Sequence, residues 1–118
     1  MGGSEKANRF MEITKIVVTP HAIQTLRTEF DWLKDNASVA FANKFRNDFK
    51  TQVDSILPSY LAYPECRFLL TPKNIYRNII WGNYLIIYKI RKKEILVLGI
   101  FHTKQNPNKL KSLRRIKK

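Results

Sequence analysis

The sequence has a single cysteine, few glycines and no long apolar run, and each scarcity narrows the class of protein. Cys66 stands alone, so the chain cannot form an internal disulfide, which is typical of a reducing compartment. No apolar run approaches the roughly 20 residues that a membrane-spanning helix needs. The N-terminus also lacks the apolar core of a signal peptide. We therefore expect a cytoplasmic protein without a membrane partner.

Patterns for metal or cofactor chemistry are missing as well. The two histidines and the one cysteine form no H-x-x-H or C-x-x-C spacing, and the four glycines form no phosphate-binding loop. We therefore expect no metal site and no cofactor. A catalytic thiol at Cys66 is disfavoured, because such a thiol needs a partner base and neither histidine stands in a motif relation to it.

Acidic residues are scarce in the second half of the chain. Residues 1–65 hold eight Lys or Arg and eight Asp or Glu, whereas residues 66–118 hold fourteen Lys or Arg and one acid, Glu94. The net charge of +13 therefore lies entirely in the second half. A solubilising surface would spread its charge over both halves. The asymmetry instead indicates a polyanionic target or an acidic protein partner.

The length of 118 residues suits one domain with a core of its own. Residues 1–10 are small and polar and have no hydrophobic periodicity, so we expect a disordered N-terminal extension, either native or left by cloning. Residues 11–118 are expected to form a single domain with a basic C-terminal tail.

Three consecutive strands are predicted in the middle of the basic half, as an antiparallel meander. Residues 75–81 are rich in β-branched and aromatic side chains, and Gly82-Asn83 is a two-residue hairpin turn. Residues 84–91 run back, and residues 95–102 form the third strand. Alternation in the middle strand places apolar side chains on one face and ends the other with Lys89 and Arg91. One face should therefore be covered and the other should present positive charge.

The first half of the chain predicts a strand followed by two helices. Residues 12–19 read as a short strand, and Thr19 caps an amphipathic helix over residues 20–35. Ser38 caps a second helix that ends before Pro58. Because only a few residues join them, the two helices should form an antiparallel hairpin on one face of the sheet.

The remaining segments are a long connection and a tail. Residues 58–74 contain three prolines, and residues 67–70 could add a short extra strand. In the tail, Leu110, Leu113 and Ile116 could share one face of a short helix, which alone is too short to persist in water. The resulting fold class is α+β: an antiparallel sheet of about four strands with a two-helix hairpin on one face, in the order β-α-α-β-β-β.

An ordered set of residues resembles the RelE/ParE superfamily of toxins from type II toxin–antitoxin systems. The residues are Tyr76-Arg77, the turn Gly82-Asn83-Tyr84, Tyr88 at the end of an Ile-Ile-Tyr run, and His102-Thr-Lys-Gln-Asn-Pro107 after the last strand. The likeness extends from about Ile13 to Leu113. It implies a growth-inhibiting toxin that is neutralised by a cognate antitoxin, and the positive charge suggests that this antitoxin is acidic and partly disordered.

The resemblance implies two possible targets. Members similar to RelE cut messenger RNA at the ribosome as metal-independent endoribonucleases, whereas members similar to ParE inhibit DNA gyrase without nuclease chemistry. We expect ribosome-dependent mRNA cleavage, with gyrase inhibition as the alternative. Two features depart from the nuclease pattern: Leu85 stands where many nuclease members have an arginine, and no tyrosine follows Pro107. Whether the chain is an enzyme therefore stays open.

Site residues are carried over from this resemblance. The candidate catalytic residues are Arg77, His102 and Lys104, with cations stabilising the phosphate and His102 moving the proton. The candidate nucleic-acid-binding residues are Lys73, Arg77, Lys89, Arg91, Lys109, Lys111, Arg114 and Arg115. Two quieter roles remain possible: Arg77 could brace the neighbouring loop or sheet, and His102 could make a structural hydrogen bond at its strand end. Tyr84 and Tyr88 are expected in the core.

Overall fold

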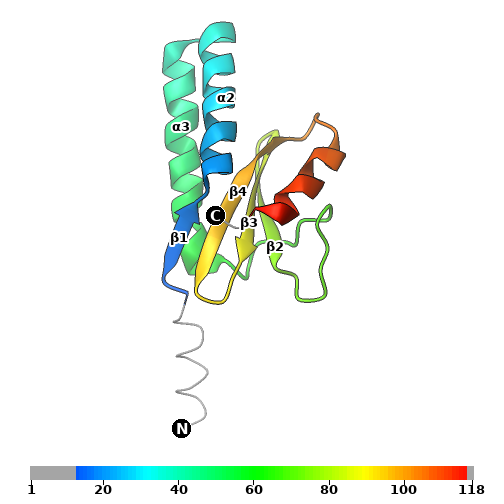
Figure 1. The fold of residues 1–118 in the computed structure, drawn as a ribbon. Coiled ribbons are helices and arrows are strands. Elements are labelled where there is room, and N and C mark those ends of the chain that lie inside the picture. The colour runs from blue at the N-terminus through cyan, green and yellow to red at the C-terminus, as the bar shows by residue number, and fades with distance from the viewer. Residues whose placement is uncertain (1–12, 117–118) are drawn as a thin grey trace.

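The structure is a computed structural model that describes residues 13–116. The extension expected at residues 1–10 lies outside the described residues. The elements are β1 (Lys15–Val18), α2 (Pro20–Asn36), α3 (Val39–Asp54), α4 (Ile56–Ser59), β2 (Tyr76–Trp81), β3 (Tyr84–Ile90), β4 (Glu94–His102) and the 3₁₀ helix η1 (Pro107–Arg115). Their order confirms the predicted β-α-α-β-β-β arrangement, with the tail folded as an additional short helix (Figure 1).

The four strands form one mixed sheet in the order β1-β4-β3-β2. The predicted meander is confirmed, because β2 pairs with β3 and β3 with β4 in antiparallel registers. The N-terminal strand differs from a wholly antiparallel sheet, since β1 pairs with β4 in parallel. The physical reason is the helical hairpin: α2 leads the chain away from the sheet and α3 leads it back. A meander of three strands then leaves β4 running in the direction of β1.

Both helices begin at the residues that the sequence indicated. The Thr19 side chain accepts a hydrogen bond from the Ala22 N–H, and its hydroxyl and N–H also donate to the Val97 carbonyl, at 2.8 and 3.1 Å. Thr19 therefore caps α2 and ties the start of the helix to β4. Ser38 caps α3 in the same way, through the Phe41 N–H. Pro58 does not mark the end of α3, which stops at Asp54; the proline lies within the short α4.

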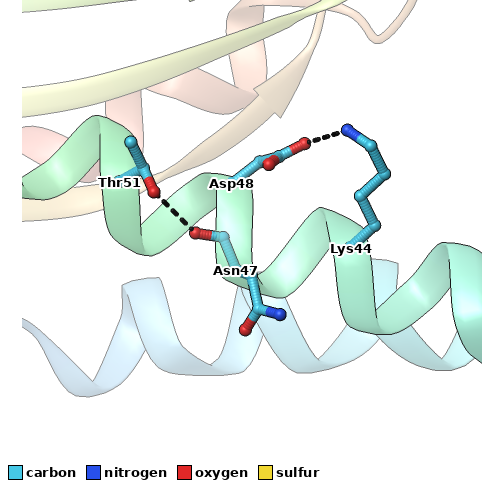
Figure 2. Close-up of polar contacts among 4 residues, drawn as sticks. All are labelled: Lys44, Asn47, Asp48 and Thr51. Carbon is cyan, nitrogen blue, oxygen red and sulfur yellow. Dashed lines mark hydrogen bonds and ion pairs between the residues drawn. The ribbon is translucent and has the colours of Figure 1, made fainter.

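The outer surface of the hairpin carries balanced charge. In α3 the Lys44 ammonium lies 2.8 Å from the Asp48 carboxylate, one turn along the helix (Figure 2). In the next turn the Thr51 hydroxyl donates to the Asn47 carbonyl at 3.2 Å (Figure 2). Exposed pairs of this kind contribute only a few tenths of a kcal/mol. Because Lys44 and Asp48 neutralise each other, this pair adds nothing to the net positive charge, which lies on the sheet and the tail.

Both faces of the sheet are covered, which corrects the expectation of one open, charged face. On the side of the helices, Phe49 and Val53 of α3 pack against Ile86 and Tyr88 of β3. We call this side the helix face. The opposite side, which we call the tail face, packs the connection before β2 and the helix η1. Its buried residues are Cys66, Leu69, Tyr76, Ile87, Leu96, Leu98, Phe101, Leu110 and Leu113.

The segment at residues 67–70 is not the extra strand that was considered. It forms turns, and the β-bridge to β2 comes from Glu65, opposite Arg77. Leu69 is fully buried on the tail face, so this segment supplies a core side chain rather than a fifth strand. Pro64 and Pro72 flank this region, and neither can donate a backbone hydrogen bond to a neighbouring strand.

The tail helix η1 owes its geometry to its apolar spacing. Leu110 and Leu113 are buried and Ile116 packs beside them, so the apolar residues recur every third position. A 3₁₀ helix has three residues per turn and aligns such positions on one face. The shared face expected from the sequence is therefore confirmed, and packing on β4 supplies the stability that the isolated segment lacks.

We predict that the tail is part of the cooperative fold. Replacing Leu113 with alanine should lower the free energy of unfolding by roughly 2 to 4 kcal/mol, because the cavity would lie in a closed apolar cluster. Lys111→Ala, an exposed change in the same helix, should alter it by no more than about 0.5 kcal/mol. Urea denaturation followed by circular dichroism measures both values. Equal stabilities for the two variants would contradict the packed tail.

Candidate functional site

Arg77 is held by the loop that precedes β2. Its Nη1 group donates to the carbonyls of Leu61 and Tyr63, at 2.9 and 2.8 Å, and its Nε donates to the Asn74 carbonyl at 3.2 Å. These three bonds join the two ends of the loop to the strand. The planar guanidinium suits this role, since it can hold several carbonyls in fixed directions. The position matches the bracing role that the sequence left open for Arg77.

Arg77 and His102 lie at opposite ends of the sheet. Arg77 pairs with Tyr88 on β3, and His102 pairs with Tyr84 from the other side of β3. This register separates their backbones by about 13 Å along the strands and about 10 Å across them. Residues that pair across strands share a face, so both point to the helix face. The structure therefore does not bring these two candidate catalytic residues together.

His102 and Lys104 lie close to each other at the end of β4. The Lys104 backbone N–H donates to Nδ1 of His102 at 3.1 Å, and the His102 N–H donates to the Gln105 side chain at 3.1 Å. In the neutral imidazole this places the ring proton on Nε2. The ring of Tyr84 lies edge-on to His102, with centroids 5.0 Å apart. His102 is half-buried and Lys104 is exposed.

A cleft beside His102 brings together residues that the sequence analysis did not select. The cleft, about 300 Å³ in volume, lies between α2 and η1 over the end of β4, and His21, Thr25 and Glu29 of α2 line it. The Tyr84 hydroxyl donates to the Glu29 carboxylate at 2.7 Å. Burial and this hydrogen bond to an anion raise the pKa of Tyr84 well above its usual range. The spacing of His21, Thr25 and Glu29 on one helix face was the signal available in the sequence.

Two of the predicted cations gather at the far end of the tail face. The Lys89 ammonium lies 5.4 Å from the centre of the Tyr76 ring, and the Arg114 guanidinium carbon lies 5.9 Å from it. Arg114 also donates to the Leu70 carbonyl at 3.3 Å. Cations above an aromatic ring gain a modest electrostatic attraction. The structure therefore places Lys89 and Arg114 together, although they are far apart in the sequence.

The other predicted nucleic-acid-binding residues lie on the surface. The exposed residues are Lys73, Arg91, Lys109, Lys111 and Arg115. They come from the loop before β2, the turn after β3 and the helix η1, so the exposed cations of the basic half are spread over several surface segments. Among residues 13–116, no group of three or more His, Cys, Asp or Glu side chains could hold a metal ion.

The position that carries an arginine in many nuclease members has an apolar environment in this chain. Leu85 pairs with Phe101 on β4 and lies on the tail face, opposite to the face of Arg77. It lines a groove of about 500 Å³ together with Phe68, Ile80 and Phe101. A phosphate in this groove would meet mainly carbon atoms.

Comparison with protein families assigns this fold to the small toxins of toxin–antitoxin systems. The family model for the "ParE toxin of type II toxin-antitoxin system, parDE" matches residues 16–107, and the chain therefore belongs to the ParE toxin family. A cognate antitoxin partner follows from this membership. The likeness to RelE/ParE toxins in the sequence is thus confirmed.

A solved structure gives the same fold. The chain is similar to a chain described as "Chromosomal ParDE TA system from P. aeruginosa", with a TM-score of 0.67 and 18% sequence identity. The match covers 79% of this chain and 99% of the other one. At this identity the likeness shows the fold alone. No curated protein sequence matches the chain. In residues 13–116, none of the helices is both long and apolar enough to cross a membrane.

We predict that Arg77 stabilises the loop before β2. Arg77→Lys should lower the free energy of unfolding by roughly 1 to 3 kcal/mol, because lysine cannot hold three carbonyls and leaves at least one without its donor. Lys73→Ala, an exposed change in the same loop, should have little effect. Thermal unfolding gives the stabilities, and limited proteolysis reports opening of the loop. Unchanged stability with loss of toxicity would instead indicate phosphate contact by Arg77.

We also predict a loss of stability at alkaline pH. Burial raises the pKa of the Tyr88 hydroxyl, an effect that the nearby Arg77 charge opposes, and this hydroxyl donates to the Tyr60 carbonyl at 2.6 Å. The unfolded chain ionises its tyrosines near pH 10, whereas the folded chain keeps this proton. Stability should therefore be retained below about pH 10 and fall above it. Tyr88→Phe should show a shallower fall in urea titrations between pH 8 and 11; an equal slope would exclude Tyr88 as a cause.

Proposed function

We propose that the chain stops growth by binding DNA gyrase, in the manner of ParE-type toxins, and that it does not cleave RNA. The observation that carries this proposal is the environment of Arg77. Its guanidinium is bonded to three backbone carbonyls and lies far from His102. A phosphoryl transition state needs cations and a proton carrier that converge on one atom. The main candidate cation and the candidate proton carrier do not converge.

Two further observations support a binding protein over a nuclease. Leu85 and Phe101 make the tail face apolar where many nuclease members have an arginine. The match to the ParE family model points to the branch for which the sequence implied gyrase inhibition. In this proposal the exposed cations of the tail contact an acidic surface of the target, and no residue of the chain performs chemistry.

Ribosome-dependent mRNA cleavage remains the second candidate. One observation favours it: the half-buried His102 and the exposed Lys104 are adjacent, beside a cleft of mixed polar and apolar lining. A nuclease built on this pair would need a different phosphate-binding cation from Arg77. Lys109 lines the same cleft and is the candidate for that role.

We predict that the tail cations, and not His102, determine toxicity. Inhibition of DNA supercoiling by purified gyrase measures the activity, and growth after induction measures toxicity. The double change Lys109→Glu with Lys111→Glu should weaken both by about tenfold or more, because it reverses two exposed charges at the proposed interface. His102→Ala should leave both within about twofold, since general acid–base catalysis is not involved.

The matched control reverses two exposed charges elsewhere. Lys34→Glu with Lys50→Glu makes the same change in net charge on the helical hairpin and should preserve inhibition. A tail truncation is a poorer test, because Leu110 and Leu113 belong to the core. The gyrase proposal fails if His102→Ala abolishes toxicity in a folded protein and mapped 5′ ends reveal cleavage within translated messages.

A further inference from the structure

The cleft between α2 and η1 carries one side chain of each charge on a partly apolar lining. Its volume is about 300 Å³. Among the described residues that line it, Glu29 of α2 is the only carboxylate and Lys109 of η1 is the only Lys or Arg. The apolar part of the lining comes from Ile87, Phe101, Leu110 and Leu113. A concave site with a few charged groups on apolar walls is typical of small-molecule binding.

Glu29 carries a negative charge that no cation of the described chain neutralises. The side chain is half-buried, and its Oε2 accepts from the Tyr84 hydroxyl at 2.7 Å. Within residues 13–116, no Lys, Arg or His nitrogen lies at ion-pairing distance from this carboxylate, although the chain has 22 Lys and Arg residues. Tyr84 does not supply the missing charge, because burial and the bond to Glu29 raise its pKa and keep the hydroxyl neutral. A half-buried carboxylate without a counter-ion favours a cationic ligand.

The Ile100 carbonyl is a second acceptor near Glu29. Ile100 stands opposite Ile86 on β3, but its N–H donates to the Thr25 hydroxyl of α2 at 3.2 Å. The N–H and carbonyl of one residue in an antiparallel strand point to the same edge, so this carbonyl also faces α2. In the part of the chain that the structure describes, no donor reaches it. Thr25 and Glu29 are one helical turn apart, so a ligand group with several N–H donors can reach both acceptors.

Lys109 selects the other end of the ligand. It is exposed and lies on η1, across the cleft from α2. A ligand with positive charge alone would be repelled by Lys109, whereas a ligand that also carries a carboxylate would be attracted to it. Methylene groups between the two charges can pack on the apolar lining, as the stems of long charged side chains do. A basic amino acid has this combination of groups.

We propose that the cleft binds a basic amino acid, with its cationic side chain at Glu29 and its carboxylate at Lys109. Arginine fits better than lysine, because its planar guanidinium can donate to Glu29 and to the Ile100 carbonyl at once. A free amino acid and the C-terminal residue of a peptide present the same groups. The inference goes beyond the proposed function, since contact between the tail cations and gyrase does not use Glu29.

Calorimetric titration of the purified full chain with L-arginine tests the proposal. L-citrulline is the matched ligand, because a neutral urea group replaces the guanidinium in a molecule of the same shape. Arginine should bind about tenfold or more tightly than citrulline, since only arginine forms a charge-assisted hydrogen bond with Glu29. Glu29→Gln should weaken arginine binding by about tenfold and remove its preference over citrulline, while the new amide can still accept from Tyr84.

The matched protein control is Asp31→Asn. It makes the same change in charge on an exposed residue of α2 that lines a different groove, and it should alter arginine affinity by less than about twofold. Agmatine, which is arginine without its carboxylate, tests Lys109. It should bind about threefold or more weakly than arginine, and Lys109→Gln should remove this difference. Circular dichroism checks that each variant is folded.

The outcomes separate this site from the proposed function, because every affinity is measured without gyrase. Equal binding of arginine and citrulline, or an arginine affinity that Glu29→Gln leaves unchanged, overturns the proposal. So does the absence of binding by both arginine and a peptide that ends in arginine. Tighter binding of that peptide than of free arginine, with the same dependence on Glu29, would support the site and identify protein C-termini as its ligands.

Discussion

The strand β4 is the constraint on which the rest of the structure depends. It pairs with β1 on one side and β3 on the other, and its residues from Glu94 to Gly99 are buried on both faces. A strand that is apolar on both faces needs a covering layer on each. The helical hairpin supplies one layer, and the loop before β2 with the helix η1 supplies the other. Thr19 links the first layer to β4 directly, because it caps α2 and bonds to Val97.

The same constraint decides which charged residues are available for function. Arg77 points to the helix face, where the loop carbonyls surround its guanidinium. Lys89 and Arg114 lie on the tail face against Tyr76. A cleft of mixed polar and apolar lining, with His102 in its wall, forms where the sheet edge is bounded by α2 and η1. The basic half of the chain is therefore divided among separate surfaces, an arrangement that suits contacts with large partners better than one compact catalytic centre.

The cations of the tail and the apolar groove occupy the same face of the sheet. The cations of the tail surround η1, while the apolar groove lies near the β2 edge on the same face. Because η1 belongs to the core through Leu110 and Leu113, the position of its cations is fixed by the fold.

Local signals in the sequence predicted the main strands and helices, their order and the family. Strand alternation, the caps Thr19 and Ser38 and the Gly82-Asn83 turn are local signals, since each depends on a few neighbouring residues. Tertiary structure alone decided the parallel pairing of β1 with β4, the covering of the tail face and the role of Arg77 as a brace. These features depend on contacts between residues far apart in the chain, such as Arg77 with Leu61 or Arg114 with Tyr76. The spacing of residues along the sequence does not predict which groups will surround an arginine side chain. The register of the strands and the layers that cover the sheet determine those surroundings.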